Sequence, residues 1–363
     1  MTDRPTIGIA MLGYAFMGKA HSRALRALQE LDPPLRPELV SLSGRDPEAR
    51  EAVRARFGWE EAVGDWHEQV ADERIGLFDN GGPNFLHAEP SIAAARAGKH
   101  VLCEKPLGMT ADESYEMWQE AERAGVVHMC GFNYRFVPAV RLARELLEAG
   151  ELGDLVHFRA RYLQSGGWDA DPARWRFHKA LAGTGAIGDL GTHIIDIARY
   201  LVGDVASVSA LVRTVVPDRE VDDHFVAVVE FENGMPGTLE ASRLARGRIN
   251  HNTFEVNGTK GSLTFDVERM NELEVTVDGR FFRRILVTER DHPFMRYWWP
   301  PGHIVGWGDT FTHELGHLLE AIAGGHAVGP HGATFEDGYR CSEVVDAILR
   351  SAESGRRKTV TYR

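Results

Sequence analysis

The chain opens with a short apolar run, a glycine-containing turn and a helical pattern, in that order. The run Thr6–Leu12 leads directly into Gly13-Tyr-Ala-Phe-Met-Gly18. Apolar residues then recur at helical spacing as far as Leu28. A strand that passes through a glycine turn into a helix is typical of the first unit of a parallel α/β sheet. This feature constrains the fold more than any other part of the sequence.

The turn reads G-x-A-x-x-G, one residue away from the dinucleotide fingerprint G-x-G-x-x-G. Gly13 permits the tight turn, and Gly18 lets the helix and the strand approach closely. Ala15 replaces the glycine that lets backbone N–H groups reach a pyrophosphate, and its methyl group is tolerable if φ stays negative. The residues expected to bind a dinucleotide here are Gly13, Tyr14, Ala15, Phe16, Met17 and Gly18.

Strand and helix patterns continue to alternate up to about residue 131. Further strands are expected at Glu38–Ser43, Ile75–Asp79, His100–Cys103 and Val126–Cys130, and helices at Asp46–Phe57, Glu89–Ala97 and Thr110–Ala124. Thr110 and Glu113 have the spacing of a capping box, in which Glu113 reaches back to the N-cap backbone. The alternation predicts a doubly wound parallel sheet, whose ligands bind at the carboxyl ends of the strands.

That location singles out the residues that follow each strand. Further cofactor-binding candidates are Gly44, Arg45, Pro83, Asn84, Glu104, Lys105 and Asn133. An NAD enzyme usually has a carboxylate after the second strand, where this chain has Gly44 and Arg45. Because Arg pairs with phosphate, NAD(P) binding with a slight preference for NADP is expected. The alternative is that Arg45 stacks on adenine or lies in solvent and NAD is accepted.

The pattern changes after Asn133. A helix is expected over Val137–Ala149, and Val156, Phe158, Ala160 and Tyr162 alternate with polar residues as in a half-buried strand. Later strands are expected at Val205–Val216, His224–Glu232, Thr238–Ser242, Thr253–Val256, Ser262–Phe265, Leu273–Val277 and Phe281–Val287, with hairpin turns at Asn233-Gly234, Asn257-Gly258 and Asp278-Gly279. These elements predict a mixed, largely antiparallel sheet with helices on one face.

The expected organisation is therefore a Rossmann domain over residues 1–131 and an α+β substrate-binding and oligomerisation domain over 132–363, with the substrate cleft between them. The length of 363 residues fits two domains and leaves none for a third. Because one side of such a sheet commonly packs against another subunit, we expect a homo-oligomer, a dimer or a tetramer.

Composition excludes several classes of partner. The net charge of −12 argues against nucleic acid and anionic membranes, which demand a basic surface. Cys103, Cys130 and Cys341 are too few for a disulfide framework and indicate a reducing compartment. The sequence shows no signal peptide and no apolar stretch of the roughly 18 residues that a membrane helix needs. We expect a cytoplasmic protein with a small-molecule substrate.

Four motifs occur in an order that resembles the Gfo/Idh/MocA oxidoreductases, the glucose–fructose oxidoreductase and inositol dehydrogenase family. They are residues 13–21, Pro83-Asn84 with Leu86-His87, Glu104-Lys105-Pro106, and Gly188–His193. The resemblance covers essentially the whole chain, and segments such as Trp175–Phe177 are similar to members that oxidise anhydrosugars. It implies hydride transfer between nicotinamide and a secondary hydroxyl or ketone of a sugar, anhydrosugar or inositol. It also adds His87 to the cofactor site.

The same resemblance assigns the catalytic positions to Lys105, Asp189 and His193. Alcohol oxidation needs a base, and His193 has a suitable unperturbed pKa. Asp189 lies four residues earlier, so on an α-helix both side chains share a face. Lys105 can stabilise negative charge on the reacting oxygen, or take the proton itself if burial lowers its pKa. The sequence leaves open whether Lys105 or His193 is the base.

Aromatic faces and forked donors suit a sugar, although tryptophans also fill protein cores. Candidate substrate residues are Tyr134, Arg135, Gln164, Trp168, Trp175, Arg176 and Lys179, together with Asp189 and His193. Gly82 stands where the family often has a threonine, so one hydroxyl that could contact the cofactor is absent.

Two other functions compete with this one. His313-Glu314-Leu-Gly-His317 has the H-E-x-x-H spacing of zinc peptidases. The metzincin continuation fails, although Glu336 or Glu343 could nominally be a third ligand. A peptidase leaves the first 130 or so residues unexplained, so no metal is expected. A cofactor-binding sensor or an inactive homologue is the other alternative, and it predicts cofactor binding without turnover.

Overall fold

The structure is a computed structural model that describes residues 4–363. Its contacts divide the chain into two compact units, Met1–Asn133 with Trp307–Tyr339 and Tyr134–Gly306 with Arg340–Arg363. The chain first passes from one unit to the other between Asn133 and Tyr134, close to the expected division at residue 131. The segment 307–339 returns to the first unit, which no pattern along the sequence indicates.

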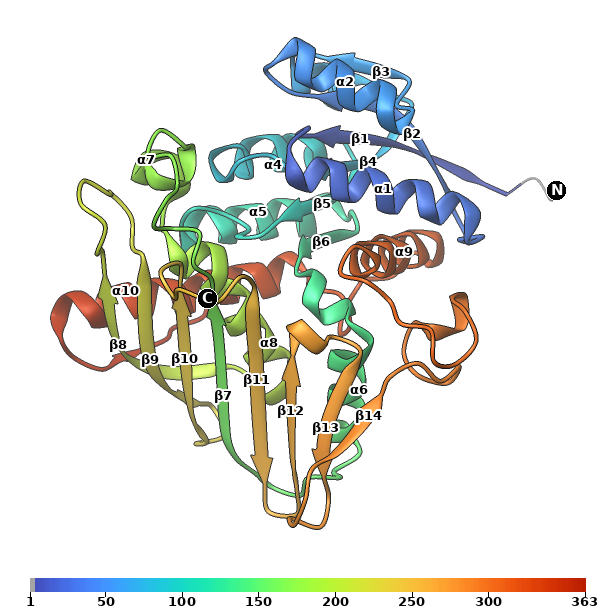
Figure 1. Cartoon of the computed structure of the whole chain (residues 1–363). Coiled ribbons are helices and arrows are strands. Elements are labelled where there is room, and N and C mark those ends of the chain that lie inside the picture. Colours follow the sequence, from blue (N-terminus) through green and yellow to red (C-terminus); the bar gives the residue numbers. More distant parts are fainter. Residues whose placement is uncertain (1–3) are drawn as a thin grey trace. The chain divides into compact units, whose positions relative to one another are not determined.

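The first unit is built on a parallel sheet with the strand order β3-β2-β1-β4-β5-β6 (Figure 1). Its strands are β1 (Thr6–Leu12), β2 (Arg36–Ser43), β3 (Glu61–Val63), β4 (Ile75–Asn80), β5 (His100–Glu104) and β6 (His128–Gly131). Its helices are α1 (Phe16–Glu30), α2 (Pro47–Phe57), α3 (Trp66–Ala71), α4 (Ala88–Arg96), α5 (Ala111–Ala124), α9 (Asp309–Gly324) and the start of α10 (Phe335–Ser354).

Two groups of helices pack in this unit: α1 contacts α2 and α9, whereas α4 contacts α3 and α5. The central strands are buried along nearly their whole length, because helices cover both faces of the sheet. The strand order is that of a Rossmann fold, so the predicted doubly wound sheet is confirmed.

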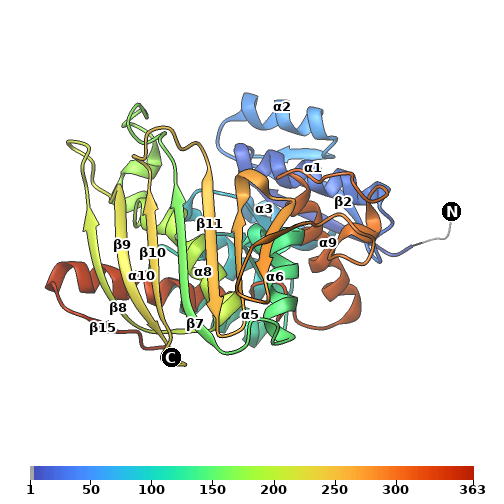
Figure 2. The same cartoon turned by 60° about the horizontal axis from the view of Figure 1, so that its bottom comes forward.

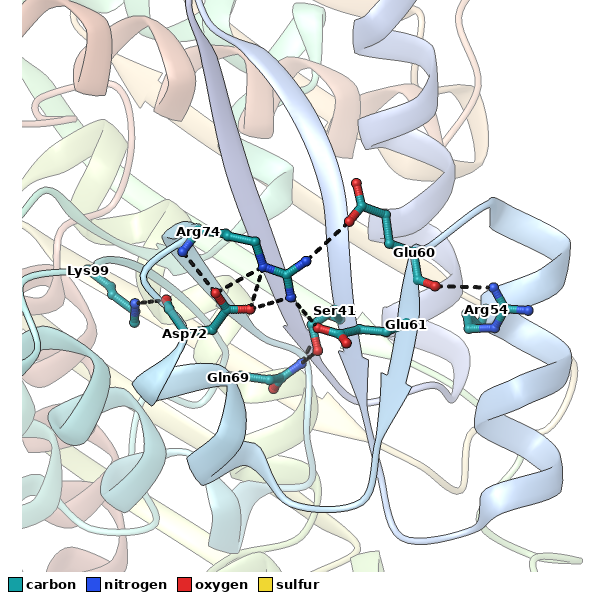
Figure 3. Close-up of polar contacts among 8 residues, drawn as sticks. All are labelled: Ser41, Arg54, Glu60, Glu61, Gln69, Asp72, Arg74 and Lys99. Atoms are coloured by element: carbon teal, nitrogen blue, oxygen red, sulfur yellow. Dashed lines mark hydrogen bonds and ion pairs between the residues drawn. The ribbon is translucent and has the colours of Figure 1, made fainter.

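Elements β3 and α3 were not predicted, since three and six residues are too short to show a period. Side-chain contacts hold them instead (Figure 3). The buried Gln69 amide donates to the carbonyl and hydroxyl oxygens of Ser41, at 3.0 and 3.2 Å. Arg74 pairs with Glu61 and Asp72, each at 2.6 Å. The contacts of Gln69 with Ser41 and of Arg74 with Glu61 join distant parts of the chain and fix the edge of the sheet.

The cap of α5 differs slightly from the predicted capping box. The Thr110 hydroxyl accepts the Glu113 N–H at 3.1 Å, as expected. The Glu113 carboxylate instead accepts the N–H of Met109, one residue before the N-cap, at 2.8 Å.

The second unit contains a sheet with the order β14-β13-β12-β11-β7-β10-β9-β8-β15. Its strands are β7 (Leu155–Leu163), β8 (Val205–Arg213), β9 (His224–Phe231), β10 (Pro236–Ser242), β11 (His251–Gly258), β12 (Ser262–Asp266), β13 (Glu272–Thr276), β14 (Arg283–Leu286) and β15 (Lys358–Thr359). Its helices are α6 (Pro138–Glu148), α7 (Lys179–Ala182), α8 (Thr192–Val202) and the rest of α10.

Only β7 and β10 pair in parallel within this sheet. The predicted mixed, largely antiparallel sheet is therefore confirmed. Helices α6 and α8 pack on one face of it (Figure 2). On the opposite face, the pairing of β8 with β9 brings Leu211 next to Val226, and Val228 lies two residues further along β9. These three side chains are 60, 40 and 57% exposed.

Two of the three predicted hairpin turns are confirmed: Asn233-Gly234 joins β9 to β10, and Asp278-Gly279 joins β13 to β14. The prediction at Asn257-Gly258 is wrong, because both residues belong to β11. The Gly258 N–H donates to the carbonyl of Gly261, so the turn falls over residues 259–261. The strand alternation of β7 also fails at one end, where Val156 is 51% exposed.

Candidate active site

The turn between β1 and α1 leaves no room for a side chain at either glycine. Gly13 has a φ of +112°. A Cβ atom at Gly18 would lie 2.0 Å from the Gly13 carbonyl oxygen. Helix α1 therefore begins directly against the end of β1, as the two glycines predict.

Helix α1 begins without a side-chain cap. Ala15 is its N-cap residue, with a φ of −79°, and the first turn carries no acidic side chain. The negative φ explains how alanine replaces the middle glycine without strain. Uncapped N–H groups at the positive end of a helix fit a pyrophosphate, so the backbone of Phe16 and Met17 would hold one.

Tyr14 and Gly44 form the neighbouring wall. A Cβ atom at Gly44 would lie 2.1 Å from two carbons of the Tyr14 ring, so only glycine lets the ring lie there. The Tyr14 hydroxyl accepts the N–H of Asp46 at 3.3 Å. Arg45 is exposed beside this contact. The structure thus brings Tyr14, Gly44 and Arg45 together at the end of β2.

The loop after β4 carries Pro83, Asn84 and His87. Asn80, which sequence analysis did not select, holds this loop by donating to the Leu86 and His87 carbonyl oxygens at 2.8 and 3.2 Å. Pro83 and Asn84 are partly exposed. His87 is buried, and burial lowers its pKa.

The His87 ring links two loops. Nδ1 lies 2.7 Å from the Pro106 carbonyl oxygen, and Nε2 lies 3.1 Å from that of Gly82. A neutral ring donates to only one of these two carbonyl oxygens, so His87 packs between the loop after β4 and the loop that carries Lys105 and hydrogen-bonds one of them.

Glu104 ends β5, and Lys105 follows it. The Glu104 carboxylate is buried, and its Oε2 accepts the Lys105 N–H at 3.1 Å. Its Oε1 lies 3.1 Å from Nε2 of His21. Lys105 is partly exposed, at the same edge of the sheet as the glycine turn, because the carboxyl ends of parallel strands share an edge.

Asn133 follows β6 and is buried. Its side-chain amide donates to the hydroxyl of Thr310 in α9 at 2.9 Å. That hydroxyl donates in turn to the Trp307 carbonyl at 2.7 Å. The contacts of the Asn133 amide therefore anchor α9 within the first unit.

In the second unit, Asp189 and His193 do not lie on one continuous α-helix. Asp189 belongs to a π-helical turn, Ile187–Gly191, and His193 lies in the first turn of α8. The prediction of a shared α-helical face is thus wrong in its local geometry. Asp222 fixes the start of the π turn, since its buried carboxylate accepts the N–H groups of Gly185 and Ile187 at 2.6 and 2.8 Å. Burial raises the pKa of Asp222.

Asp189 pairs with Arg243, a residue that sequence analysis missed. Nη2 of Arg243 lies 2.9 Å from Oδ2 of Asp189. Arg243 directly follows β10 and is buried, whereas the Asp189 side chain is 33% exposed. The carboxylate is therefore fixed from its buried side and remains accessible to a ligand. Nothing near Arg243 in the sequence signals this pairing.

Two tyrosine rings enclose the His193 imidazole. The Tyr134 ring meets it edge-on at 4.8 Å, and the Tyr162 ring lies 5.7 Å away. The Tyr162 hydroxyl lies 2.9 Å from that of Tyr134 and donates to Oδ1 of Asn250 at 2.7 Å. The Asn250 amide donates back to the Tyr134 hydroxyl at 3.4 Å.

These hydrogen bonds form a closed ring, to which Gln164 adds a bond from Nε2 to Oδ1 of Asn250 at 2.8 Å. Burial raises the pKa of Tyr162 well above its ordinary value, and the Tyr134 contact adds to the rise. The neutral hydroxyl therefore persists as a donor. The structure thus brings together Tyr134, Gln164 and His193 among the predicted residues and adds Tyr162 and Asn250. The alternation of β7 could have indicated Tyr162, but no pattern marks Asn250.

Arg135 is held in a buried ion pair. Its Nε and Nη2 donate to the Asp196 carboxylate at 2.9 and 2.6 Å, and its guanidinium lies 4.8 Å from the centre of the Tyr200 ring. Both partners are almost fully buried. These contacts give Arg135 a structural role beside the tyrosine network.

The remaining substrate candidates lie on the segment 168–179. The Trp168 indole N–H donates to the Leu244 carbonyl at 2.8 Å. Arg176 lies over the Trp175 ring at 4.6 Å. Arg176 and Lys179 are exposed. The contacts found for these four residues do not join them to the His193 network.

The H-E-x-x-H segment lies in α9 and is built into the first unit. Glu314 is fully buried, and Nε2 of His317 lies 2.7 Å from the Val328 carbonyl oxygen. Within residues 4–363, three side chains with metal-ligating atoms converge elsewhere, at His251, Asp266 and Glu268. The Arg248 guanidinium also lies there, 3.6 Å from the Glu268 carboxylate. The zinc-peptidase alternative is therefore not supported.

A Rossmann sheet with an uncapped helix behind its glycine turn defines a dinucleotide-binding domain. The profile of the oxidoreductase family with an NAD-binding Rossmann fold matches residues 7–132. The GFO/IDH/MocA C-terminal domain matches residues 140–264. The chain belongs to the Gfo/Idh/MocA oxidoreductase family.

Curated relatives include levoglucosan dehydrogenase from Pseudarthrobacter phenanthrenivorans, which is 40% identical over 95% of this chain and 96% of its own length. D-xylose 1-dehydrogenase (NADP(+)) 2 from Haloferax volcanii is 30% identical over 88% of this chain and 90% of its own. The solved complex of levoglucosan dehydrogenase with NADH and L-sorbose has a TM-score of 0.94 at 40% identity and covers 99% of this chain and 100% of its own. Among the described residues, no helix is long and apolar enough to cross a membrane.

Replacing Tyr162 with phenylalanine removes the central hydroxyl of the ring of hydrogen bonds. The Tyr134 hydroxyl and the Asn250 amide then lose buried partners, which costs about 1–3 kcal/mol of folding free energy. Urea denaturation should show this loss, whereas Tyr297→Phe, at a tyrosine that is 42% exposed, should change stability far less. Equal effects of the two substitutions would contradict the network.

Proposed function

We propose that the protein is an NAD(P)-dependent dehydrogenase that transfers hydride between nicotinamide and a secondary hydroxyl or ketone of a sugar, anhydrosugar or inositol. The observation that carries the proposal is the position of Lys105. It follows β5 at the sheet edge where β1 opens into the glycine turn, and its N–H is held by Glu104 at 3.1 Å. The similarity to levoglucosan dehydrogenase favours an anhydrosugar among these substrates.

The cofactor, when bound, accepts or supplies the hydride. The backbone of residues 13–18 would hold its pyrophosphate, with Gly44, Arg45, Pro83, Asn84, His87, Glu104, Lys105 and Asn133 completing or supporting the site. Asn133 and His87 support it through the contacts described above.

The second unit would supply the groups that act on the substrate. His193 can take the hydroxyl proton, and the two tyrosine rings restrict its orientation. Asp189, held by Arg243, can accept a hydrogen bond from a neighbouring substrate hydroxyl. Lys105 can donate to the reacting oxygen and stabilise the charge that develops there, or act as the base in place of His193.

The test is a panel of levoglucosan, free sugars and inositols with NAD⁺ and with NADP⁺, followed by the absorbance of the reduced nicotinamide. Lys105→Met and His193→Asn should each lower turnover by roughly 10²–10⁴-fold, the usual contribution of an acid–base group, while NADH still binds. Lys260→Met and His326→Asn, at exposed positions, are the matched controls. Cofactor binding without turnover on any substrate would indicate a sensor or an inactive homologue instead.

We further propose that Arg45 contacts the 2′-phosphate of NADP. The side chain is exposed after β2, and no carboxylate occupies that position. Arg45→Ala should weaken NADP binding roughly tenfold, the scale of one charge-assisted hydrogen bond, and leave NAD binding nearly unchanged. Arg36→Ala, at the other end of β2, is the control. A variant that loses both cofactors equally would show that Arg45 does not read the 2′-position.

The exposed face of the nine-stranded sheet supports the proposal of a homo-oligomer, either a dimer or a tetramer. Leu211, Val226 and Val228 place apolar surface there without covering helices. Sedimentation should show an oligomer at micromolar concentration and dissociation in Val226→Arg/Val228→Arg. The control is Ile304→Arg, at a loop residue that is 68% exposed. A wild-type monomer at that concentration would exclude the oligomer.

A further inference from the structure

Three ionisable side chains are buried together beneath the end of the parallel sheet. His21 of α1 lies between Asp79 of β4 and Glu104 of β5. Nδ1 of His21 is 3.0 Å from both Asp79 oxygens, and Nε2 is 3.1 Å from Oε1 of Glu104. The side chains of His21 and Asp79 are 0% exposed, and that of Glu104 is 5% exposed.

The contacts suit an imidazolium that donates to both carboxylates, whose charge offsets the burial that raises the pKa of Asp79. A neutral ring carries one N–H and can donate to one carboxylate only, whereas both ring nitrogens of His21 face carboxylate oxygens. Burial alone would lower the pKa of His21, but the carboxylates of Asp79 and Glu104 raise it well above its ordinary value. Leaving two buried carboxylates without a cation would be costly, because each loses its hydration.

The cluster is connected to Lys105 through Glu104. While Oε1 of Glu104 faces His21, Oε2 accepts the Lys105 N–H at 3.1 Å. Gly131 of β6 leaves the room for this carboxylate, since a Cβ atom there would lie 3.0 Å from Oε1. His87 contacts the carbonyl oxygen of Pro106, the residue that follows Lys105. Lys105 is thus held at its own N–H, and His87 packs just after it.

We propose that His21 is a positioning residue for Lys105, acting as a buried imidazolium that aims the Glu104 carboxylate at the Lys105 backbone. The catalytic part of this inference rests on the proposed dehydrogenase function. The positioning part concerns the fold of the first unit and can be measured without turnover.

The test compares His21→Phe, which keeps a flat aromatic ring of larger size and removes both donors, with His21→Gln, which keeps a single amide. The control is His128→Gln, at another buried histidine of the same unit that bonds Glu122 and the Phe335 N–H. Hydrogen exchange of peptides spanning Lys105 is measured first. Pro106 has no N–H and adds nothing to the exchange of these peptides, so the Lys105 amide makes up a larger share of the measured exchange. Both His21 variants should accelerate its exchange, and His128→Gln should not.

Turnover and NADH affinity are measured on the same proteins. The His21 variants should lose roughly 10–100-fold in kcat, the scale of a small misplacement of a catalytic group, with NADH affinity changed far less. If exchange at Lys105 and kcat both match the control in a folded His21 variant, the positioning role is wrong. If wild-type protein oxidises no substrate, the proposed function fails, and the exchange measurement still decides whether His21 positions Lys105.

Discussion

The close approach of helix α1 to the turn before it is the constraint on which the first unit depends. Any side chain at Gly18 would meet the Gly13 carbonyl at 2.0 Å, so the helix must begin where the strand ends. This places uncapped N–H groups at the sheet edge, where a pyrophosphate fits. It also places His21, on the second turn of the same helix, between the carboxylates of β4 and β5.

The second unit orders its proposed catalytic residues by a different means. A π turn, rather than a regular helix, separates Asp189 from His193, and each residue then has its own support. Asp189 is held by Arg243, and His193 is enclosed by the Tyr134 and Tyr162 rings. Because these supports come from β10, β7 and loops far apart in the chain, they require the complete sheet.

The sequence predicted what depends on local pattern. The glycine turn and the parallel strands were found because apolar period and turn chemistry act over a few residues, whereas Asp189 and His193 were selected only through the family resemblance. It missed β3 and α3, which Gln69 and Arg74 hold by distant contacts, and it placed one hairpin turn inside β11. The buried ion pair of Arg135 was also not predicted, because its partner Asp196 lies in another helix. Arg243 and Asn250 carry no local signal at all.

Hydride that passes directly between a sugar carbon and nicotinamide carries its isotope with it, so isotope transfer distinguishes this reaction from reduction by solvent hydrogen. A substrate from the sugar panel is prepared with deuterium on the carbon that is oxidised, and the reduced cofactor is analysed by mass spectrometry and NMR. Each molecule of reduced cofactor should carry one deuterium on the nicotinamide ring, and His193→Asn and Lys105→Met should form this deuterated product more slowly than the wild-type protein. Reduced cofactor that carries only solvent hydrogen would rule out direct transfer.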